Sequence, residues 1–222
     1  MDALNDHEQA QLLRQWWQEN WLPLVLGLVL ALTGVLGWQF WQGYRESQSE
    51  EASAEYESLR EALGTQQDAL IEQKLNRLFS DYAGTPYSAL GALAAAQHYA
   101  AAGALEKAQK PLAWAADKAG DEGVRQLARL RLARVLWALN QPEQALKAIA
   151  SASDKAFAPL FGELRGDILL SQGKRAEARA AYEKALESQK SAPDTAAVAG
   201  EAEKSVDTGS LERKLADLRA DQ

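Results

Sequence analysis

The chain has 222 residues, with 24 Lys or Arg against 31 Asp or Glu, a net charge of −7 and no cysteine. The lack of cysteine excludes disulfides, thiolate zinc sites and cysteine nucleophiles. The balanced and slightly acidic composition argues against a nucleic-acid partner, because a surface that binds phosphates is basic.

Residues 1–20 form a short charged tail, with one basic residue, Arg14, against four acidic residues. A segment of this length does not fold alone. Basic residues near the membrane are enriched on the cytoplasmic side, but here they do not orient the chain. One of them, Arg14, lies before the apolar run, and two, Arg45 and Arg60, lie soon after it.

Residues 21–43 are predicted to be a transmembrane helix. No charge falls between Glu19 and Arg45. At about 1.5 Å per residue, the 21 residues of the apolar run from Trp21 to Trp41 span about 31 Å, which matches the hydrocarbon core of a bilayer. The run is too long, and the tail before it too acidic, for a cleaved signal peptide. Tryptophans of the kind that lie at headgroup level flank it on both sides: Trp16, Trp17, Trp21, Trp38 and Trp41.

Small residues recur within this helix, at Gly27, Ala31, Gly34 and Gly37. Small side chains at such spacings let a second membrane helix approach closely, so these four are predicted helix-packing positions. The alternative is that glycine is simply frequent in membrane helices.

Residues 44–187 are predicted to form paired helices. A helix ending near Gly64 and a second one ending near Tyr82 make a first pair, which we expect to cap the array at its membrane end. Beyond it, one pattern of residue types recurs three times at nearly fixed spacing, and we call it the register. Its order is a small residue, a bulky residue, Gly or Asn, Ala, a bulky residue and Ala. The copies are Ala96, Tyr99, Gly103, Ala108, Leu112 and Ala115; Ala133, Leu136, Asn140, Ala145, Ile149 and Ala152; and Gly166, Leu169, Gly173, Ala178, Tyr182 and Ala185.

The copies are offset by 37 and then 33 residues, near the 34-residue tetratricopeptide period. Small residues let the two helices of a pair approach, and Gly103, Asn140 and Gly173 stand where a left-handed residue ends each first helix. The sequence thus resembles the tetratricopeptide class and predicts an all-α fold, a single N-terminal transmembrane helix followed by an α-solenoid of antiparallel helix pairs. The alternative is an ordinary helical bundle with chance periodicity.

The end of the chain changes in composition. Residues 188–209 are rich in Ser, Ala, Asp and Thr and are predicted to be a flexible linker. Residues 210–222 are predicted to be a C-terminal helix, because Leu211, Leu215 and Leu218 form an apolar stripe that could dock on the last repeat.

No catalytic constellation is present in the sequence, so we expect no enzyme, no cofactor and no metal site. The two histidines, His7 and His98, are too few for a metal cluster. Four arginines between residues 125 and 134 suggest an anion site, but at 100° per residue they spread around the helix, and several must be solvated or paired.

A binding surface is the remaining possibility. In tetratricopeptide arrays the first helix of each pair lines a groove for a peptide. The residues expected to face such a groove here are Gln97, Arg134, Trp137, Glu163 and Asp167. Trp137 is either an exposed anchor for a partner or part of the core.

Several segments resemble the bacterial YfgM family of ancillary translocon subunits, over most of the chain. They are residues 37–41, 82–93, 129–134, 164–173 and 214–218. The resemblance implies an inner-membrane protein with residues 1–20 in the cytoplasm and the repeats in the periplasm. Its implied partners are the Sec translocon, a membrane-anchored periplasmic chaperone of the prolyl-isomerase type and nascent secreted proteins. The alternative function is an adaptor in envelope stress signalling that acts through the cytoplasmic tail.

Overall fold

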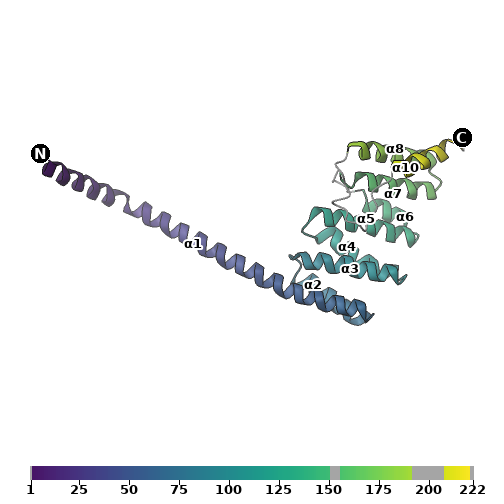
Figure 1. Cartoon of the computed structure of the whole chain (residues 1–222), viewed down its shortest axis with the longest axis horizontal. Coiled ribbons are helices and arrows are strands. Elements are labelled where there is room, and N and C mark those ends of the chain that lie inside the picture. Colours follow the sequence, from purple (N-terminus) through teal and green to yellow (C-terminus); the bar gives the residue numbers. More distant parts are fainter. Residues whose placement is uncertain (1, 151–155, 192–207, 221–222) are drawn as a thin grey trace. The chain divides into compact units, whose positions relative to one another are not determined.

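The computed structural model describes residues 2–150, 156–191 and 208–220, and every regular element in these ranges is an α-helix. The chain divides into two compact units, residues 1–48 and 49–222, each described here by itself. Figure 1 labels the helices. The expected all-α fold is confirmed.

The first unit consists of the N-terminal part of α1 (Asp2–Gly64). Within the described residues, this helix contains one stretch that is long and apolar enough to cross a membrane. The hydroxyl of Thr33 donates to the carbonyl of Val29 at 2.8 Å. The polar side chain is therefore satisfied within the helix, as a lipid environment requires.

Aromatic side chains gather where the apolar stretch ends. The rings of Trp38 and Trp41 lie 5.2 Å apart, and the guanidinium of Arg45 lies 4.7 Å from the Trp41 ring centroid. A cation over an indole ring, at the first charge after an apolar run, is an arrangement suited to the membrane–water boundary.

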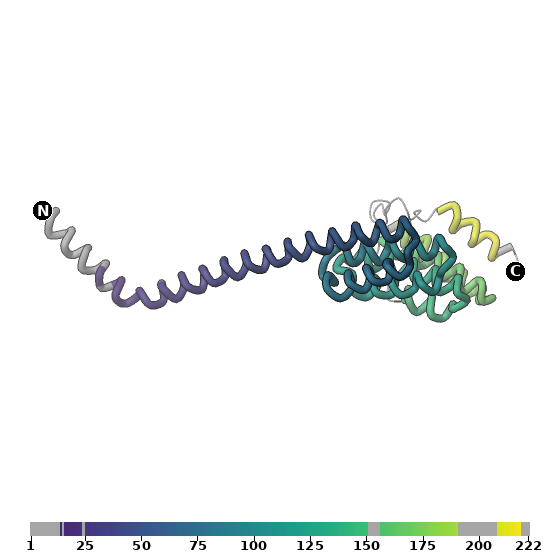
Figure 2. The backbone as a smooth tube through the Cα atoms, turned by 90° about the horizontal axis from the view of Figure 1, so that it is seen from below, coloured from purple at the N-terminus to yellow at the C-terminus, as the bar shows by residue number. Residues whose placement is uncertain are grey.

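The second unit is a stack of helical hairpins. Figure 1 shows them one after another in chain order, with α10 beside α8. Figure 2 shows the same helices from below, where they overlap. The C-terminal part of α1 pairs with α2 (Asp68–Asp81), α3 (Pro86–Ala101) with α4 (Leu105–Lys118), α5 (Glu122–Ala138) with α6 (Pro142–Ala148), and α7 (Ala158–Ser171) with α8 (Arg175–Ser191); α10 (Thr208–Ala220) follows.

Each of the last three hairpins turns through a left-handed residue. The φ angles are +74° at Gly103, +59° at Asn140 and +75° at Gly173. In each turn the next residue donates its backbone N–H five positions back: Ala104 to Tyr99 at 2.8 Å, Gln141 to Leu136 at 2.9 Å and Lys174 to Leu169 at 3.0 Å. These are Schellman turns, and the predicted left-handed caps are confirmed.

The first hairpin follows the same register. Gln66 has a φ of 56°, and Gln67 donates to Ala62 at 3.2 Å. Gln66 lies 37 residues before Gly103, so this pair is a further copy of the repeat as well as the start of the stack. The side-chain sizes hide it in the sequence: buried Leu59 and Ile71 occupy positions that are alanine or glycine in the other copies.

Replacing Gln66 by glycine is expected to raise the free energy of unfolding by about 0.5–1 kcal/mol. The left-handed conformation strains a residue with a Cβ, and glycine relieves that strain at a smaller cost in chain entropy. Thermal unfolding of the detergent-solubilised chain, followed by circular dichroism, measures the change. Gln67→Gly is the control, because Gln67 has a φ of −88° and gains nothing from glycine.

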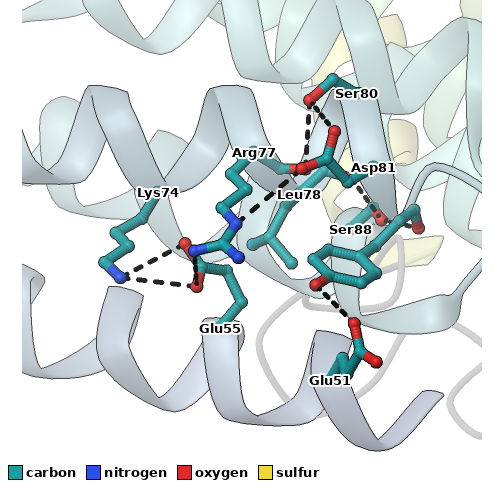
Figure 3. Close-up of polar contacts among 9 residues, drawn as sticks. Glu51, Glu55, Lys74, Arg77, Leu78, Ser80, Asp81 and Ser88 are labelled. Carbon is teal, nitrogen blue, oxygen red and sulfur yellow. Dashed lines mark hydrogen bonds and ion pairs between the residues drawn. The ribbon is translucent and has the colours of Figure 1, made fainter. Parts of the chain in front are cut away.

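Polar contacts tie the first hairpin together, as Figure 3 shows. The carboxylate of Glu55, 8% exposed, lies 3.3 Å from Lys74 Nζ and 3.5 Å from Arg77 Nη1, and the hydroxyl of Tyr82 donates to Glu51 at 3.0 Å. On α3, the fully buried hydroxyl of Ser88 donates to the carbonyl of Leu78 at 3.0 Å. Buried polar groups with partners fix the register of the hairpin and its contact with α3.

Small residues set the helix spacing, as the register predicts. Ala108, Ala145 and Ala178 are fully buried. Among the described glycines, the tightest position is Gly166 on α7, where an added Cβ would lie 2.3 Å from the ring of Tyr182 on α8. The last hairpin closes only because residue 166 has no side chain.

Candidate partner-binding surface

A depression of about 430 Å³ lies between α3 and α5. Its polar side chains are Gln97 on α3 and Arg131 and Arg134 on α5. The remaining lining is apolar: Ala96, Ala100, Ala101, Leu112 and Val135. An apolar floor with a few convergent polar groups is the usual composition of a ligand or peptide subsite.

The structure separates the four arginines of α5 into different roles. Arg131 and Arg134 lie one turn apart and line the same depression. Arg125 is paired with Glu122, and Arg129 lies 3.8 Å from Glu122 and lines another depression, against α4 and α6. The contacts of Arg125 and Arg129 with Glu122 agree with the sequence prediction that several of the four are solvated or paired. The prediction missed that Arg131 and Arg134 line one depression, which needs the floor supplied by α3.

Arg131 is half-buried, whereas Arg134 is exposed at the edge of the depression. Desolvation lowers the pKa of Arg131 from its ordinary value. Desolvation also lowers the pKa of Arg134, while the negative charges of Glu163 and Asp167 on α7 act in the opposite direction. An arginine keeps its charge in either case.

Glu163 and Asp167 are bridged by Lys214 of α10. The ammonium of Lys214 lies 2.9 Å from Glu163 Oε1 and 2.7 Å from Asp167 Oδ1. The hydroxyl of buried Tyr182 donates to the same Asp167 oxygen at 2.7 Å. Burial, and then this hydrogen bond, raise the pKa of Tyr182 far above its ordinary value, so the phenol stays neutral.

The apolar stripe of α10 completes this contact. Leu211, Leu215 and Leu218 are buried in one cluster with side chains of α5, α7 and α8. The predicted docking of the terminal helix on the last repeat is thus what the structure shows. Residues 192–207, most of the predicted linker, lie outside the described residues.

The five predicted groove residues therefore fall into three settings. Gln97 and Arg134 line the depression between α3 and α5. Glu163 and Asp167 face α10 and hold Lys214. Trp137 is half-buried against the core, and its indole N–H donates to Ser171 Oγ on α7 at 3.2 Å. Their role in binding a partner stays a prediction.

A second tryptophan of the repeat unit, Trp114, is one that the sequence reasoning left out. Its ring stacks on Phe79 with centroids 4.2 Å apart and planes 9° apart. It joins α4 to α2, so its role is packing between successive hairpins.

The predicted helix-packing positions of the membrane segment are open. A Cβ added at Gly27, Gly34 or Gly37 would meet no atom of the described chain within 4 Å. Packing of a second membrane helix against these positions stays a prediction.

Across the described ranges, no group of three or more His, Cys, Asp or Glu side chains could hold a metal ion. His98 lies with its ring 5.6 Å from that of Tyr99, half-buried on α3.

The contact between Lys214 and the two carboxylates is expected to weaken at alkaline pH. Burial lowers the pKa of Lys214, but hydrogen bonds to Asp167 and Glu163 outweigh it, and the net pKa lies above the ordinary 10.5. A raised pKa of a cationic group means that its stabilisation is complete below pH 10.5 and is lost as the pH rises through the folded-state pKa.

The matched variant is Lys214→Arg, whose guanidinium keeps its charge. Between about pH 9 and about pH 11.5, the melting temperature of the native chain is expected to fall further than that of Lys214→Arg. An equal fall in the melting temperature of the two proteins would show that deprotonation of Lys214 does not change stability in this pH range.

Within the residues that the structure describes, the fold is that of a helical repeat protein with one candidate membrane helix and a depression, lined by two arginines, between two successive hairpins. A family model described as a tetratricopeptide repeat-like domain matches residues 14–204. The chain belongs to this family.

Curated relatives named "Ancillary SecYEG translocon subunit" are similar over most of their length. The relative from Escherichia coli (strain K12) is 29% identical, over 83% of this chain and 88% of its own. The relative from Neisseria gonorrhoeae is 29% identical, over 83% of this chain and 88% of its own. The relative from Haemophilus influenzae is 25% identical, over 84% of this chain and 91% of its own. The resemblance to ancillary translocon subunits is confirmed.

Proposed function

We propose that this protein is a non-enzymatic ancillary subunit of the Sec translocon. In this function it links the translocon to a membrane-anchored periplasmic chaperone of the prolyl-isomerase type and aids secreted or outer-membrane proteins after translocation. The similarity to relatives that carry the translocon name is the observation that supports it, because it covers at least four-fifths of each chain.

The architecture suits this function. The candidate membrane helix would hold the repeats at the surface of the inner membrane, which raises their effective concentration near membrane partners. Stacked hairpins offer extended surfaces for peptides and helices. The residues proposed to meet partners are Gln97, Arg134, Trp137, Glu163 and Asp167, and no catalytic step is assigned to them.

The proposed orientation places residues 1–20 in the cytoplasm and the repeats in the periplasm. A reporter enzyme that is active only outside the cytoplasm, fused after Gln222, is expected to be active. A fusion that is made stably but stays inactive would place the repeats in the cytoplasm and would contradict the chaperone link.

Association with the translocon is tested by purifying the tagged full chain from mild-detergent extracts of membranes. We expect SecYEG to co-purify, and a photo-reactive residue at position 97 to crosslink to the periplasmic chaperone. The same residue at position 165, exposed on α7, is the control. Failure of SecYEG to co-purify would contradict the proposed function.

A further inference from the structure

A cavity of about 250 Å³ lies between α2 and α4, the second helices of the first two hairpins, and Tyr99 of α3 also lines it. Its apolar lining consists of Leu75, Phe79 and Pro111. Pockets for drug-sized ligands measure about 300–1,000 Å³, so this smaller cavity suits a single side chain. It is formed by other helices than the depression between α3 and α5.

Tyr99 brings a buried hydroxyl to this cavity. The side chain is 3% exposed, and within the described ranges its hydroxyl oxygen has no hydrogen-bond partner. Burial, and then the negative charges of Asp68 and Glu72, raise the pKa of Tyr99, while Lys107 acts in the opposite direction with a smaller effect. The phenol therefore stays neutral, and the carboxylates outweigh the ammonium at its hydroxyl. A buried phenol normally has a hydrogen-bond partner, and its oxygen can accept as well as donate.

The two lysines that line the cavity are both engaged by side chains of α2. Lys107 Nζ lies 2.6 Å from Asp68 Oδ2, and Lys110 Nζ donates to Asn76 Oδ1 at 3.2 Å. Glu72 stands one turn away from each of these partners, on the same face of α2. The lysines thus bind on either side of Glu72 along this face.

Two carboxylates, Glu72 on α2 and Glu106 on α4, line the same cavity and are exposed. Neither carboxylate forms a hydrogen bond or an ion pair with another of the described residues. Because Asp68 neutralises Lys107, these two groups leave the cavity with a net negative charge. Long basic side chains lay their aliphatic stems on apolar surface and pair their heads with carboxylates.

We propose that this cavity binds an arginine or lysine side chain of a partner protein. The aliphatic stem packs on the apolar lining, and the N–H groups of the head donate to Glu72, to Glu106 and to the hydroxyl of Tyr99. The net charge of −7 on the chain favours the approach of such a partner. This inference goes beyond the proposed function, because none of the five residues assigned to partner binding there lines this cavity.

The test uses a phage library of random 12-residue peptides and the full chain in phosphatidylcholine nanodiscs, whose neutral headgroups do not attract basic peptides. Three proteins are compared: the native chain, Glu72→Gln/Glu106→Gln, and a control with the same change in net charge, Glu61→Gln/Glu177→Gln. The control residues are exposed on α1 and α8. The native chain and the control are expected to enrich peptides that share an Arg or Lys at one position, and the cavity variant is expected to lose them.

A synthetic peptide from the selection then tests the hydroxyl. Tyr99→Phe is expected to weaken its binding about tenfold, the effect of losing a hydrogen bond to a charged group. The melting temperature of this variant is expected to stay unchanged or rise, because the lost hydroxyl has no partner among the described residues. Tyr82→Phe is the control: its hydroxyl donates to Glu51 at 3.0 Å, so the variant is expected to melt earlier and to bind the peptide normally.

Three results would overturn the proposal: no enrichment of basic peptides, equal binding by the cavity variant and its charge-matched control, or native affinity in Tyr99→Phe. Co-purification of SecYEG with the same proteins separates this proposal from the translocon function. A native chain that fails the peptide test but still co-purifies with SecYEG would remove the cavity as a binding site and leave the translocon function standing. A chain that binds the peptides without SecYEG would contradict only the translocon function.

Discussion

Gly166→Ala is expected to lower the free energy of unfolding by about 3 kcal/mol, the upper part of the range for overpacking a core. The added Cβ would lie 2.3 Å from the Tyr182 ring, and that ring cannot move away easily. It is fully buried, and its hydroxyl is held by Asp167. Helix α7 or α8 must therefore shift, and the shift would also disturb the carboxylate that binds Lys214.

Two further variants identify the cause. Gly64→Ala places a Cβ where no atom lies within 4 Å, so it is expected to leave stability unchanged or raise it slightly. The double variant Gly166→Ala/Tyr182→Leu removes the ring and is expected to lose less stability than the sum of the two single variants. Denaturant unfolding of the detergent-solubilised chain measures all of them. Strict additivity would show that the Gly166–Tyr182 contact is not the reason for the loss.

Leu211→Asp is expected to detach α10 from the repeats. Leu211 is fully buried, so the change removes apolar contacts and buries a carboxylate, at a combined cost of about 4 kcal/mol. A helix as short as α10 is marginal once it is alone in water. Backbone amides of residues 208–220 are then expected to exchange with solvent about as fast as those of an unfolded peptide.

Ala216→Asp is the matched control, because it places the same charge on the exposed side of the same helix. Hydrogen exchange with mass spectrometry compares the two variants with the native chain. Protection of residues 208–220 in Leu211→Asp at the native level would mean that α10 does not depend on its apolar stripe.

The parts of the fold that follow from local chemistry are readable in the sequence. The uninterrupted apolar run predicts the membrane helix because no other solvent accepts such a surface. Gly103, Asn140 and Gly173 mark the hairpin turns because few residues adopt a positive φ. Gln66 adopts the same conformation, but glutamine is not a residue type that indicates a positive φ. The large residues Leu59 and Ile71, at positions that are small in the other copies, also hide this turn in the sequence.

The surface depends on contacts that local chemistry does not contain. Lys214 binds Asp167 across 47 residues of sequence, and periodicity gives no information about such a pair. Arg131 and Arg134 line one depression because α3 lies against that side of α5, whereas Arg125 and Arg129 do not line it. Trp137 packs against the core and donates to Ser171, which belongs to the next hairpin, so its setting also depends on a distant segment.

The docking of α10 also determines which part of the fold is completed last during synthesis. Helices emerge from the ribosome in chain order, so α10 is made after every helix that it contacts. Until Leu211, Leu215 and Leu218 arrive, the last hairpin exposes the apolar surface that they cover. A chain whose synthesis stops before α10 therefore exposes an apolar patch, which proteases and chaperones recognise.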